Sequence, residues 1–310
     1  MTFGGNASVS LRCVPESDMR IPTKVEASTV SETGGLERIT PKVVEIDSRV
    51  FDLDLRSVWR YRELVYFLVW RVLKVRYKQS ALGAAYAIIQ PVFAVAVFTI
   101  VFGRFAKIPS DNVAYAPFVF AAVVPWNYFA EALRGCSSGL VDDSDLVRKV
   151  YFPRLVIPLA MVMAPAVDFA LSFMVLLALL VFYGIAPGWH VLLAPLFLVQ
   201  AMLLALSVGL WLGPVNVRFR DIKHTLPFLI QMWMYASPVV FPVSIVPERW
   251  RFLYSINPMV GVIEGFRWAV LGTASPDFRA MGLSALLILV ALVGGIFYFR
   301  KMERSFADII

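Results

Sequence analysis

Residues 155–217 read LVIPLAMVMAPAVDFALSFMVLLALLVFYGIAPGWHVLLAPLFLVQAMLLALSVGLWLGPVNV, and Asp168 is their only formally charged side chain. A helix needs about 20 mostly apolar residues to cross a hydrocarbon core that is ~30 Å thick. The stretch is therefore long enough for more than one crossing. It is interrupted at Gly184-Ile185-Ala186-Pro187-Gly188, a cluster that is typical of a turn. We expect two membrane-spanning helices joined by a short loop.

Other stretches without charged residues lie on both sides of this one, at 79–103, 112–130, 224–247 and 280–299. Of all residues, 59% are hydrophobic and only 16% are charged, and the mean hydropathy is +0.72. Soluble domains are about 45–50% apolar and about 25% charged. A soluble enzyme, a secreted disulfide scaffold and a disordered protein are excluded, as is an outer-membrane barrel, whose strands would alternate apolar and polar residues. The sequence predicts an all-α integral membrane protein with six transmembrane helices, at about 84–102, 115–133, 156–182, 189–212, 226–242 and 283–299.

The net charge of +7 is unevenly distributed over the predicted topology. Basic side chains such as Arg71, Lys149 and Arg300 gather at the flanks on the N-terminal side of the membrane. Because cytoplasmic loops are enriched in Lys and Arg, we expect a bacterial cytoplasmic (inner) membrane protein with both termini in the cytoplasm. This topology explains the basic excess without a nucleic-acid partner. Cys13 and Cys136 both fall on the cytoplasmic side, where thiols stay reduced, so we expect no disulfide.

Two segments precede the predicted membrane domain, which comprises residues 80–310. Residues 1–55 mix polar, charged, Gly and Pro residues without periodicity, so we expect a flexible cytoplasmic tail. They lack the apolar region of a cleaved signal peptide, so the first span is expected to direct insertion. Residues 56–79 favour an amphipathic helix in the inner membrane interface; a simple membrane anchor is the alternative. Its charged stripe, which would face lipid headgroups, contains Arg56, Arg60, Glu63, Arg71, Lys74 and Lys78.

Residues 252–272 are apolar enough to enter the membrane but contain Asn257-Pro258, Glu264 and Arg267. A full crossing would move the basic C-terminal residues to the outer side, so a re-entrant helix pair between spans five and six fits better. Glu264 and Arg267 are three residues apart and can pair on one helix face. They would form either a latch of an outer gate or an ordinary local ion pair.

The cluster Asp142-Asp143-Ser144-Asp145 contains the D-x-D spacing that holds a divalent metal in many glycosyltransferases. The predicted loop spans only ~20 residues, far fewer than a nucleotide-binding domain needs. We prefer the start of a short helix, since acidic residues favour the positive end of a helix. Such a helix, extending over 146–152 with exposed aromatic residues, would suit docking to a protein partner; an inert loop is the alternative. Residues 216–221 are a second such element, or else only a basic flank.

Asp168 lies near the middle of the expected third span. An acid inside the membrane could relay protons, meet a substrate or bond to a neighbouring helix. Aromatic residues of the spans could line a sugar path, although packing against lipid is the usual reason for their presence. The channel-lining candidates are Phe93, Phe98, Phe102, Trp126, Asp168, Phe169 and Trp233.

Several motifs of enzymes are missing from the sequence. It has no G-x-x-x-x-G-K-[ST] loop for phosphates, no H-E-x-x-H, no C-x-x-C and no G-x-S-x-G. Its two histidines make a histidine metal site within one chain improbable. We therefore expect a chain that is not an enzyme and holds neither a metal nor a cofactor.

A series of short motifs, in order along the chain from residue 62 onward, resembles the permease subunit of ABC-2-type polysaccharide exporters. That family includes O-antigen, capsule and teichoic-acid transporters. A single tetrapeptide would be a weak signal, but this many in matching order make the resemblance specific. The motifs lie at 73–80, 90–91, 98–103, 124–126, 149–154, 216–221, 237–238, 246–250 and 257–267.

The resemblance implies a homodimer that pairs with two copies of a separate ATPase subunit, which would hold ATP and Mg. It implies a lipid-linked polysaccharide as substrate, moved from the inner to the outer membrane face. For coupling to the ATPase it implies Asp142, Asp143, Asp145, Leu146, Arg148, Lys149, Tyr151, Phe152, Arg154, Arg218, Arg220 and Asp221. It implies an interfacial gate helix with Trp59, Arg60, Arg71, Lys74, Arg76 and Lys78, and an outer gate with Asn257, Pro258, Glu264 and Arg267.

Two other classes of function stay open at this point. A membrane glycosyltransferase that uses a polyprenyl lipid would need the aspartates at 142–145 as its catalytic cluster. A proton-coupled secondary transporter would need Asp168 as its proton site.

Overall fold

The computed structural model describes residues 59–78, 83–111, 113–149, 152–219, 221–272 and 277–309. They form helices and no β-strand, which confirms the predicted all-α class. The predicted tail at 1–55 lies outside the described residues. In chain order the elements are α2 (Arg62–Lys78), α3 (Gly83–Phe98), η1 (Thr99–Phe105), α4 (Tyr115–Asp142), α5 (Ser144–Lys149), α6 (Val156–Met163), α7 (Ala166–Phe182), η2 (Trp189–Leu193), α8 (Ala194–Arg218), α9 (Ile222–Tyr235), η3 (Val243–Ile245), α10 (Glu248–Ser255), α11 (Pro258–Leu271) and α12 (Phe278–Ile309).

Four of the described helical segments are long and apolar enough to cross a membrane. They are Ile88–Phe105, Val156–Phe182, Trp189–Arg218 and Phe278–Glu303. They coincide with the predicted first, third, fourth and sixth spans, so the chain is an integral membrane protein. The predicted fifth span coincides with α9, which has only 14 residues. That length is below the ~20 residues of a typical crossing, because the helix stops at Tyr235, shortly before Pro238.

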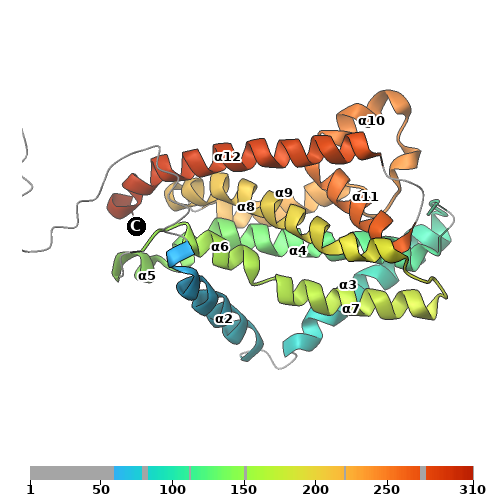
Figure 1. Ribbon diagram of the computed structural model, residues 1–310, viewed down its shortest axis with the longest axis horizontal. Helices are drawn as coiled ribbons and strands as arrows, with labels where there is room; N and C mark the ends of the chain where they lie inside the picture. Colours follow the sequence, from blue (N-terminus) through green and yellow to red (C-terminus); the bar gives the residue numbers. More distant parts are fainter. Residues whose placement is uncertain are drawn as a thin grey trace, which may run out of the picture. The chain divides into compact units, whose positions relative to one another are not determined.

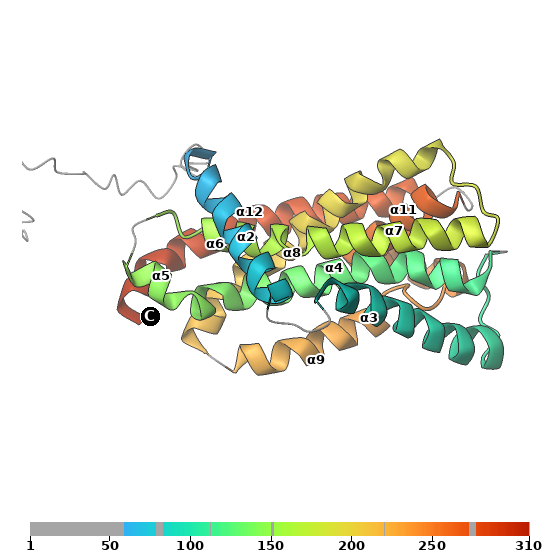
Figure 2. The same ribbon diagram turned by 90° about the horizontal axis from the view of Figure 1, so that it is seen from below.

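The predicted second span is α4, the central helix of the bundle (Figures 1 and 2). Helices α3, α6, α7, α8, α9 and α11 all contact it. Every residue from Pro117 to Trp126 is buried, which is expected for a helix enclosed by protein on all sides. Its surroundings are thus mainly other helices rather than lipid, and this explains why α4 tolerates Glu131 and Arg134 in its second half.

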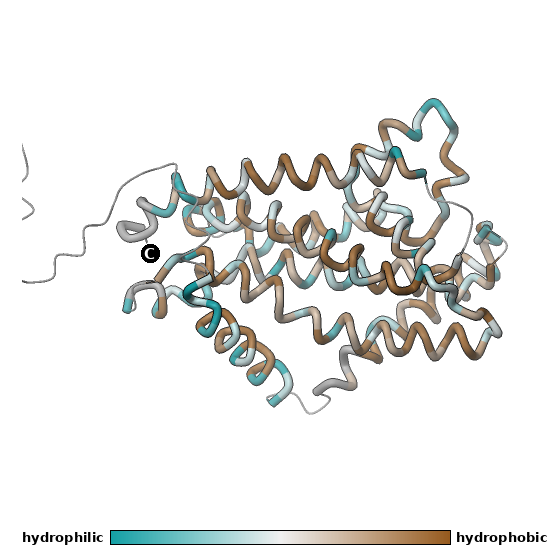
Figure 3. The backbone as a smooth tube through the Cα atoms, in the orientation of Figure 1, coloured by the Kyte–Doolittle hydropathy of each residue, from teal (hydrophilic) through white to brown (hydrophobic). Residues whose placement is uncertain are grey.

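The two ends of the bundle differ in their elements (Figure 1). One end, here called the α5 end, holds α5, the turn between α8 and α9, and the end of α12. The opposite end, the α10 end, holds η1, the α7–η2 turn and α10. Hydrophobic residues run along most of α12 between these ends, whereas hydrophilic residues concentrate at α2, near α5 and around α10 (Figure 3). This distribution agrees with a membrane that surrounds the middle of the bundle.

Helix α2 crosses the bundle obliquely near the α5 end (Figures 1 and 2). It contacts α6, and its Val65 and Leu68 are buried in a cluster with Val156 and Ile157. Its other face exposes aromatic residues such as Tyr66 and Trp70. A helix is therefore present over residues 62–78 of the predicted 56–79 segment, and it docks on protein by one apolar edge.

Candidate functional site

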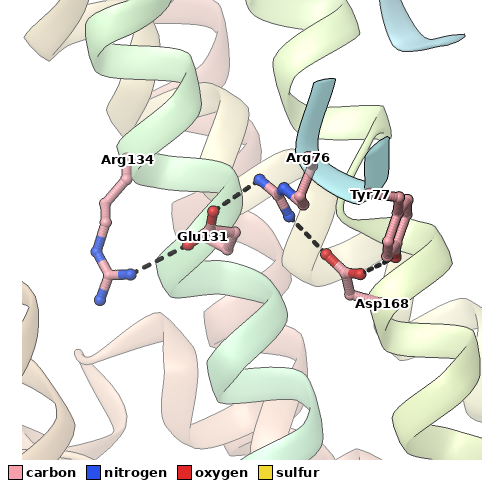
Figure 4. A network of polar contacts seen from close by, with 5 residues as sticks. All are labelled: Arg76, Tyr77, Glu131, Arg134 and Asp168. Atoms are coloured by element: carbon pink, nitrogen blue, oxygen red, sulfur yellow. Dashed lines mark hydrogen bonds and ion pairs between the residues drawn. The ribbon is translucent and has the colours of Figure 1, made fainter. Parts of the chain in front are cut away.

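An ion-pair network joins α2 to two other helices (Figure 4). Nη1 of Arg76 lies 2.5 Å from Oδ2 of Asp168 on α7, and Nη2 of Arg76 lies 2.7 Å from Oε1 of Glu131 on α4. The second oxygen of Glu131 accepts a hydrogen bond from Arg134 at 3.1 Å. The hydroxyl of Tyr77 donates to the second oxygen of Asp168. One guanidinium thus bridges two carboxylates from helices that are far apart in the sequence.

The local sequence explains the positions of Asp168 and Glu131 on their helices. Helix α7 begins at Ala166, directly after Pro165, because proline fits the start of a helix, where no backbone donor is needed. Asp168 therefore falls in the first turn, where the helix dipole favours a carboxylate. Glu131 and Arg134 are three residues apart on α4, so their side chains share one face.

Tyr77 supplies a permanent donor to this network. Burial raises the pKa of the Tyr77 phenol far above its usual value, and its hydrogen bond to Asp168 acts in the same direction. A phenol is protonated at neutral pH in any case, and the raised pKa extends this to more alkaline conditions. Asp168 consequently accepts from two neighbours on α2, the guanidinium of Arg76 and the hydroxyl of Tyr77.

A cavity of about 470 Å³ adjoins the network, between α2, α3, α4 and α7. Its volume falls in the ~300–1,000 Å³ range of small-molecule sites. Arg76, Glu131, Arg134 and Asp168 line it, together with other side chains of α2, α3, α4 and α7. The remaining lining residues are Tyr77, Gln90, Pro91, Val124, Asn127, Tyr128, Ala130, Pro165, Phe169 and Ser172.

The aspartates at the α5 end contact different basic residues instead of converging. Oδ1 of Asp143 accepts from Arg71 on α2. Oδ1 of Asp142 lies 2.8 Å from Nζ of Lys223 on α9. Among the described residues no three His, Cys, Asp or Glu side chains are arranged to hold a metal ion. The geometry of this cluster thus ties α4 to α2 and α9.

Residues 144–149 form the short helix that the sequence predicts after the aspartates. Asp145 and Lys149 are exposed and Leu146 is half-buried. Phe152, expected to be exposed, is buried, because it packs in the same cluster as Val65 and Leu68 of α2. Tyr151 and Arg220 lie outside the described residues, as does the side chain of Arg148.

Three further coupling candidates lie near α5 in sequence or at the α8–α9 turn. Nη1 of Arg154 donates to the backbone oxygen of Glu303 on α12 at 2.5 Å, so this arginine fixes the end of α12. Arg218 ends α8 and stacks over Phe219, with its Cζ 5.4 Å from the ring centre. Asp221 precedes α9, where its backbone oxygen accepts from the hydroxyl of Thr225 at 3.2 Å.

The predicted residues of α2 fall into two groups. Trp59, Arg60, Lys74 and Lys78 are exposed, as residues facing headgroups or solvent would be. Arg71 and Arg76 turn towards carboxylates of the bundle instead. The charged residues of α2 therefore do not all lie on one outward face.

At the α10 end, Arg267 is buried with only 2% of its surface exposed. Its Nη1 lies 2.6 Å from Oε1 of Glu264, and its Nη2 donates to the backbone oxygen of Pro238 at 2.8 Å. The guanidinium carbon lies 3.8 Å from the ring centre of Phe118 on α4, within the range of a cation–π interaction. Arg267 thus joins α11 to α4 and to the segment after α9.

Asn257 and Pro258 form the start of α11. The Asn257 side chain accepts from the backbone N–H of Met259 at 3.1 Å, the usual cap of a helix N-terminus, and Pro258 takes the first helical position. Oδ1 of Asn257 also accepts from Nε1 of Trp233 at 2.8 Å, and Nδ2 donates to Oγ of Ser237 at 2.9 Å. The cap therefore anchors α11 to the end of α9.

The aromatic candidates for a channel do not form one surface. Phe93 is 69% exposed on α3, and Phe98 contacts Phe102 at 5.9 Å between ring centres. Trp126 is buried in α4. Trp233 packs edge-on against Phe129 at 5.0 Å. Phe169 lines the cavity beside Asp168.

Sequence reasoning overlooked Glu131, Arg134, Tyr77, Gln90 and Asn127, which line the cavity. It also found no basic partner for Asp168 within the spans, whereas the partner is Arg76 of α2. One usable signal was the pair Glu131 and Arg134, which lies next to an apolar stretch at helical spacing. The other was the sequence Arg76-Tyr77, two donors at the end of an amphipathic helix.

These features define a polytopic helical membrane protein in which helix α2 is tied by ion pairs to two other helices beside a polar cavity. Residues 63–271 match the ABC-2 type transporter family, and the chain belongs to that family. It is 30% identical over 259 residues to an O-antigen export system permease protein (RfbA) of Myxococcus xanthus, covering 83% of this chain and 98% of the relative.

More distant relatives carry related names. An O-antigen export system permease protein (RfbA) of Klebsiella pneumoniae is 24% identical over 253 residues, which cover 80% of this chain and 95% of the relative. A polysialic acid transport protein (KpsM) of Escherichia coli is 23% identical over 243 residues, which cover 77% of this chain and 93% of the relative.

The network predicts measurable coupling between Arg76 and Asp168. In a double-mutant cycle of Arg76→Gln and Asp168→Asn, we expect each single variant to lower the unfolding free energy. The coupling energy should be about 1–2 kcal/mol, because the two groups are in contact and partly shielded from solvent. Thermal unfolding of the purified chain in lipid nanodiscs measures it. The exposed Lys78→Gln with Asp168→Asn is the matched control, with coupling near zero; equal coupling in both cycles would refute the interaction.

Proposed function

We propose that this chain is the membrane-spanning permease subunit of an ATP-driven exporter, which moves a lipid-linked polysaccharide of O-antigen or capsule type from the inner to the outer face of the bacterial cytoplasmic membrane. The observation that carries the proposal is the match to 98% of the length of an O-antigen export permease. The chain contains no phosphate-binding loop motif. ATP and Mg would be bound by a separate ATPase subunit.

The proposed assembly is a homodimer of this chain with two ATPase subunits. Each chain crosses the membrane six times, through α3 with η1, α4, α6 with α7, α8, α9 and α12. Both termini are cytoplasmic in this arrangement, and α5 faces the ATPase. The basic residues of the α5 end, among them Lys149, Arg154 and Lys223, support this orientation because cytoplasmic flanks are enriched in such residues.

In the proposed mechanism, α2 is an interfacial gate that responds to α5. Asp143 caps the end of α4, immediately before α5, and pairs with Arg71 of α2. Nucleotide-driven movement of α5 would therefore pull on α2 through this ion pair. Arg76 would transmit the same displacement to α4 and α7. A short chain of charged contacts thus links the proposed ATPase surface to the helix beside the cavity.

At the opposite end, α10 and α11 form the proposed outer gate. Helix α11 is nearly all buried and is fixed by Asn257 and Arg267, whereas α10 is mostly exposed. We therefore assign the moving part to α10 and the fixed frame to α11.

The two alternatives receive less support. A glycosyltransferase would need the aspartates at 142–145 around one reacting centre, whereas Asp142 and Asp143 pair with different helices. A proton-coupled transporter would need Asp168 as an accessible proton site, whereas its two carboxylate oxygens are engaged by Arg76 and Tyr77 of α2.

The energy source separates the exporter from the secondary transporter. In proteoliposomes that hold the permease and its ATPase, we expect glycan export to follow ATP hydrolysis and to continue after a protonophore collapses the proton gradient. Asp168→Asn should reduce export only partly, about two- to tenfold, because it weakens the attachment of α2 without removing the driving force. Transport without ATP that stops with the protonophore would overturn the proposal.

Lys149→Glu tests the docking role of α5. Reversing an exposed charge on the docking helix should reduce the co-purified ATPase about tenfold, which corresponds to ~1.4 kcal/mol at the interface. Quantitative mass spectrometry of the tagged complex measures the ratio of subunits. Lys301→Glu, an exposed lysine of α12 at the same end of the bundle, is the matched control. Unchanged stoichiometry in Lys149→Glu, or an equal loss in the control, would count against α5 as the docking helix.

Glu264→Gln tests the outer gate. The variant keeps a hydrogen-bond acceptor but leaves the buried charge of Arg267 uncompensated, which loosens α11. We expect a several-fold increase in the leak of a small anionic dye from proteoliposomes, with a lower unfolding temperature. Glu248→Gln on α10 is the control, since the Glu248 side chain is 91% exposed. A tight membrane together with an unchanged unfolding temperature in Glu264→Gln would remove the gate assignment.

A further inference from the structure

The cavity beside α2 contains two amide side chains with unused hydrogen-bonding capacity. Gln90 of α3 and Asn127 of α4 both line it, and neither has a hydrogen-bond partner among the described residues. An amide side chain offers both donors and an acceptor. A ligand that satisfies these groups must itself donate and accept hydrogen bonds.

The charged lining of the cavity is balanced. Arg76 and Arg134 contribute two positive charges, and Glu131 and Asp168 contribute two negative charges. A diphosphate carries several negative charges, whereas the cavity offers it no net positive charge, because both guanidinium groups are already paired with carboxylates. A neutral hydroxylated ligand needs no such counter-charge. Each ion-paired carboxylate has about four acceptor positions, so it retains some for a ligand hydroxyl.

The walls of the cavity also supply apolar surface. The rings of Tyr128 and Phe169 line it, and they contact each other edge-on at 5.9 Å between ring centres. Pro91, inside α3, and Pro165, directly before α7, add further apolar surface to the lining. Planar polar groups beside aromatic surface match the alternating hydroxyl and C–H faces of a sugar ring.

We propose that this cavity is a binding subsite for an uncharged sugar residue of the exported glycolipid, with Asn127 and Gln90 as its specificity-determining side chains. The inference rests on the proposed export function and names the part of the substrate that this cavity recognises. The diphosphate of the lipid carrier binds elsewhere. Asn127 and Glu131 are four residues apart on one face of α4 and both line the cavity, so one ligand can reach both side chains.

The test compares two lipids that differ by a single sugar. The full chain in lipid nanodiscs is titrated with a polyprenyl diphosphate that bears one N-acetylglucosamine, and with the same lipid without the sugar. We expect the sugar-bearing lipid to bind wild-type chain about tenfold more tightly. Asn127→Leu, similar in size but without polar atoms, should abolish this preference and leave the affinity for the bare diphosphate lipid unchanged.

Two further variants protect the test against misfolding. Gln90 is exposed, so Gln90→Leu should fold normally and reduce the preference about threefold or more. Gln231→Leu, an exposed amide on α9 outside the cavity, is the matched control and should keep the wild-type preference. Equal affinity of wild-type chain for both lipids, or a preference that survives both cavity variants, would overturn the subsite.

Export by the same variants separates this inference from the proposed function. Wild-type chain should restore surface polysaccharide in a bacterial strain from which this permease has been deleted. If export is restored while the nanodiscs show no sugar preference, the subsite is wrong and the exporter proposal stands. If the sugar preference is present but export is not restored, the exporter proposal fails while the glycolipid site remains.

Discussion

The guanidinium of Arg76 lies between the carboxylates of Glu131 and Asp168, and the position of α2 on the bundle depends on this double ion pair. Unpaired charge is costly where solvent is partly excluded, so separating the three groups carries an energetic penalty. The apolar contacts of Val65 and Leu68 with α6 fix a second edge of α2, and Arg71 with Asp143 fixes a third point. These three contacts, two ionic and one apolar, together determine the orientation of α2 on the bundle.

The membrane spans could be predicted where most side chains of a helix lie on the outside of the bundle. This is the case for residues 156–182, 189–218 and 278–303, so their apolar composition alone identifies them as spans. Helix α4 is enclosed by protein, so its side chains pack against neighbouring helices instead of lipid. Glu131 is tolerated there because it pairs with Arg76. Helix α9 is shorter than its apolar stretch because Pro238 and the polar ties of Asn257 end it early. Hydropathy alone does not contain those tertiary effects.

The candidate site was predictable only one residue at a time. Asp168 could be identified because an isolated acid in an apolar stretch is energetically costly and therefore marks a functional or structural site. Its partner lies 92 residues away on a helix with its own amphipathic pattern, so no spacing rule joins them. The same holds for Arg71 with Asp143, which are 72 residues apart. Charged residues of α2 and of the aspartate cluster were both identified from sequence, but their mutual pairing is a product of the fold.

The sites of Arg267 and Arg76 differ in how readily they can rearrange. Arg267 is enclosed on all sides and holds Glu264, the oxygen of Pro238 and the ring of Phe118 at once, so separating it would leave a charge without solvent. The Arg76 side chain is 33% exposed and adjoins a polar cavity, where water or a ligand hydroxyl can replace a lost contact. Movement is therefore cheaper at α2 than at α11. In a permease built in this way, α11 would stay fixed while the exposed α10 moves. The bundle would open first at the side where α2 meets the cavity.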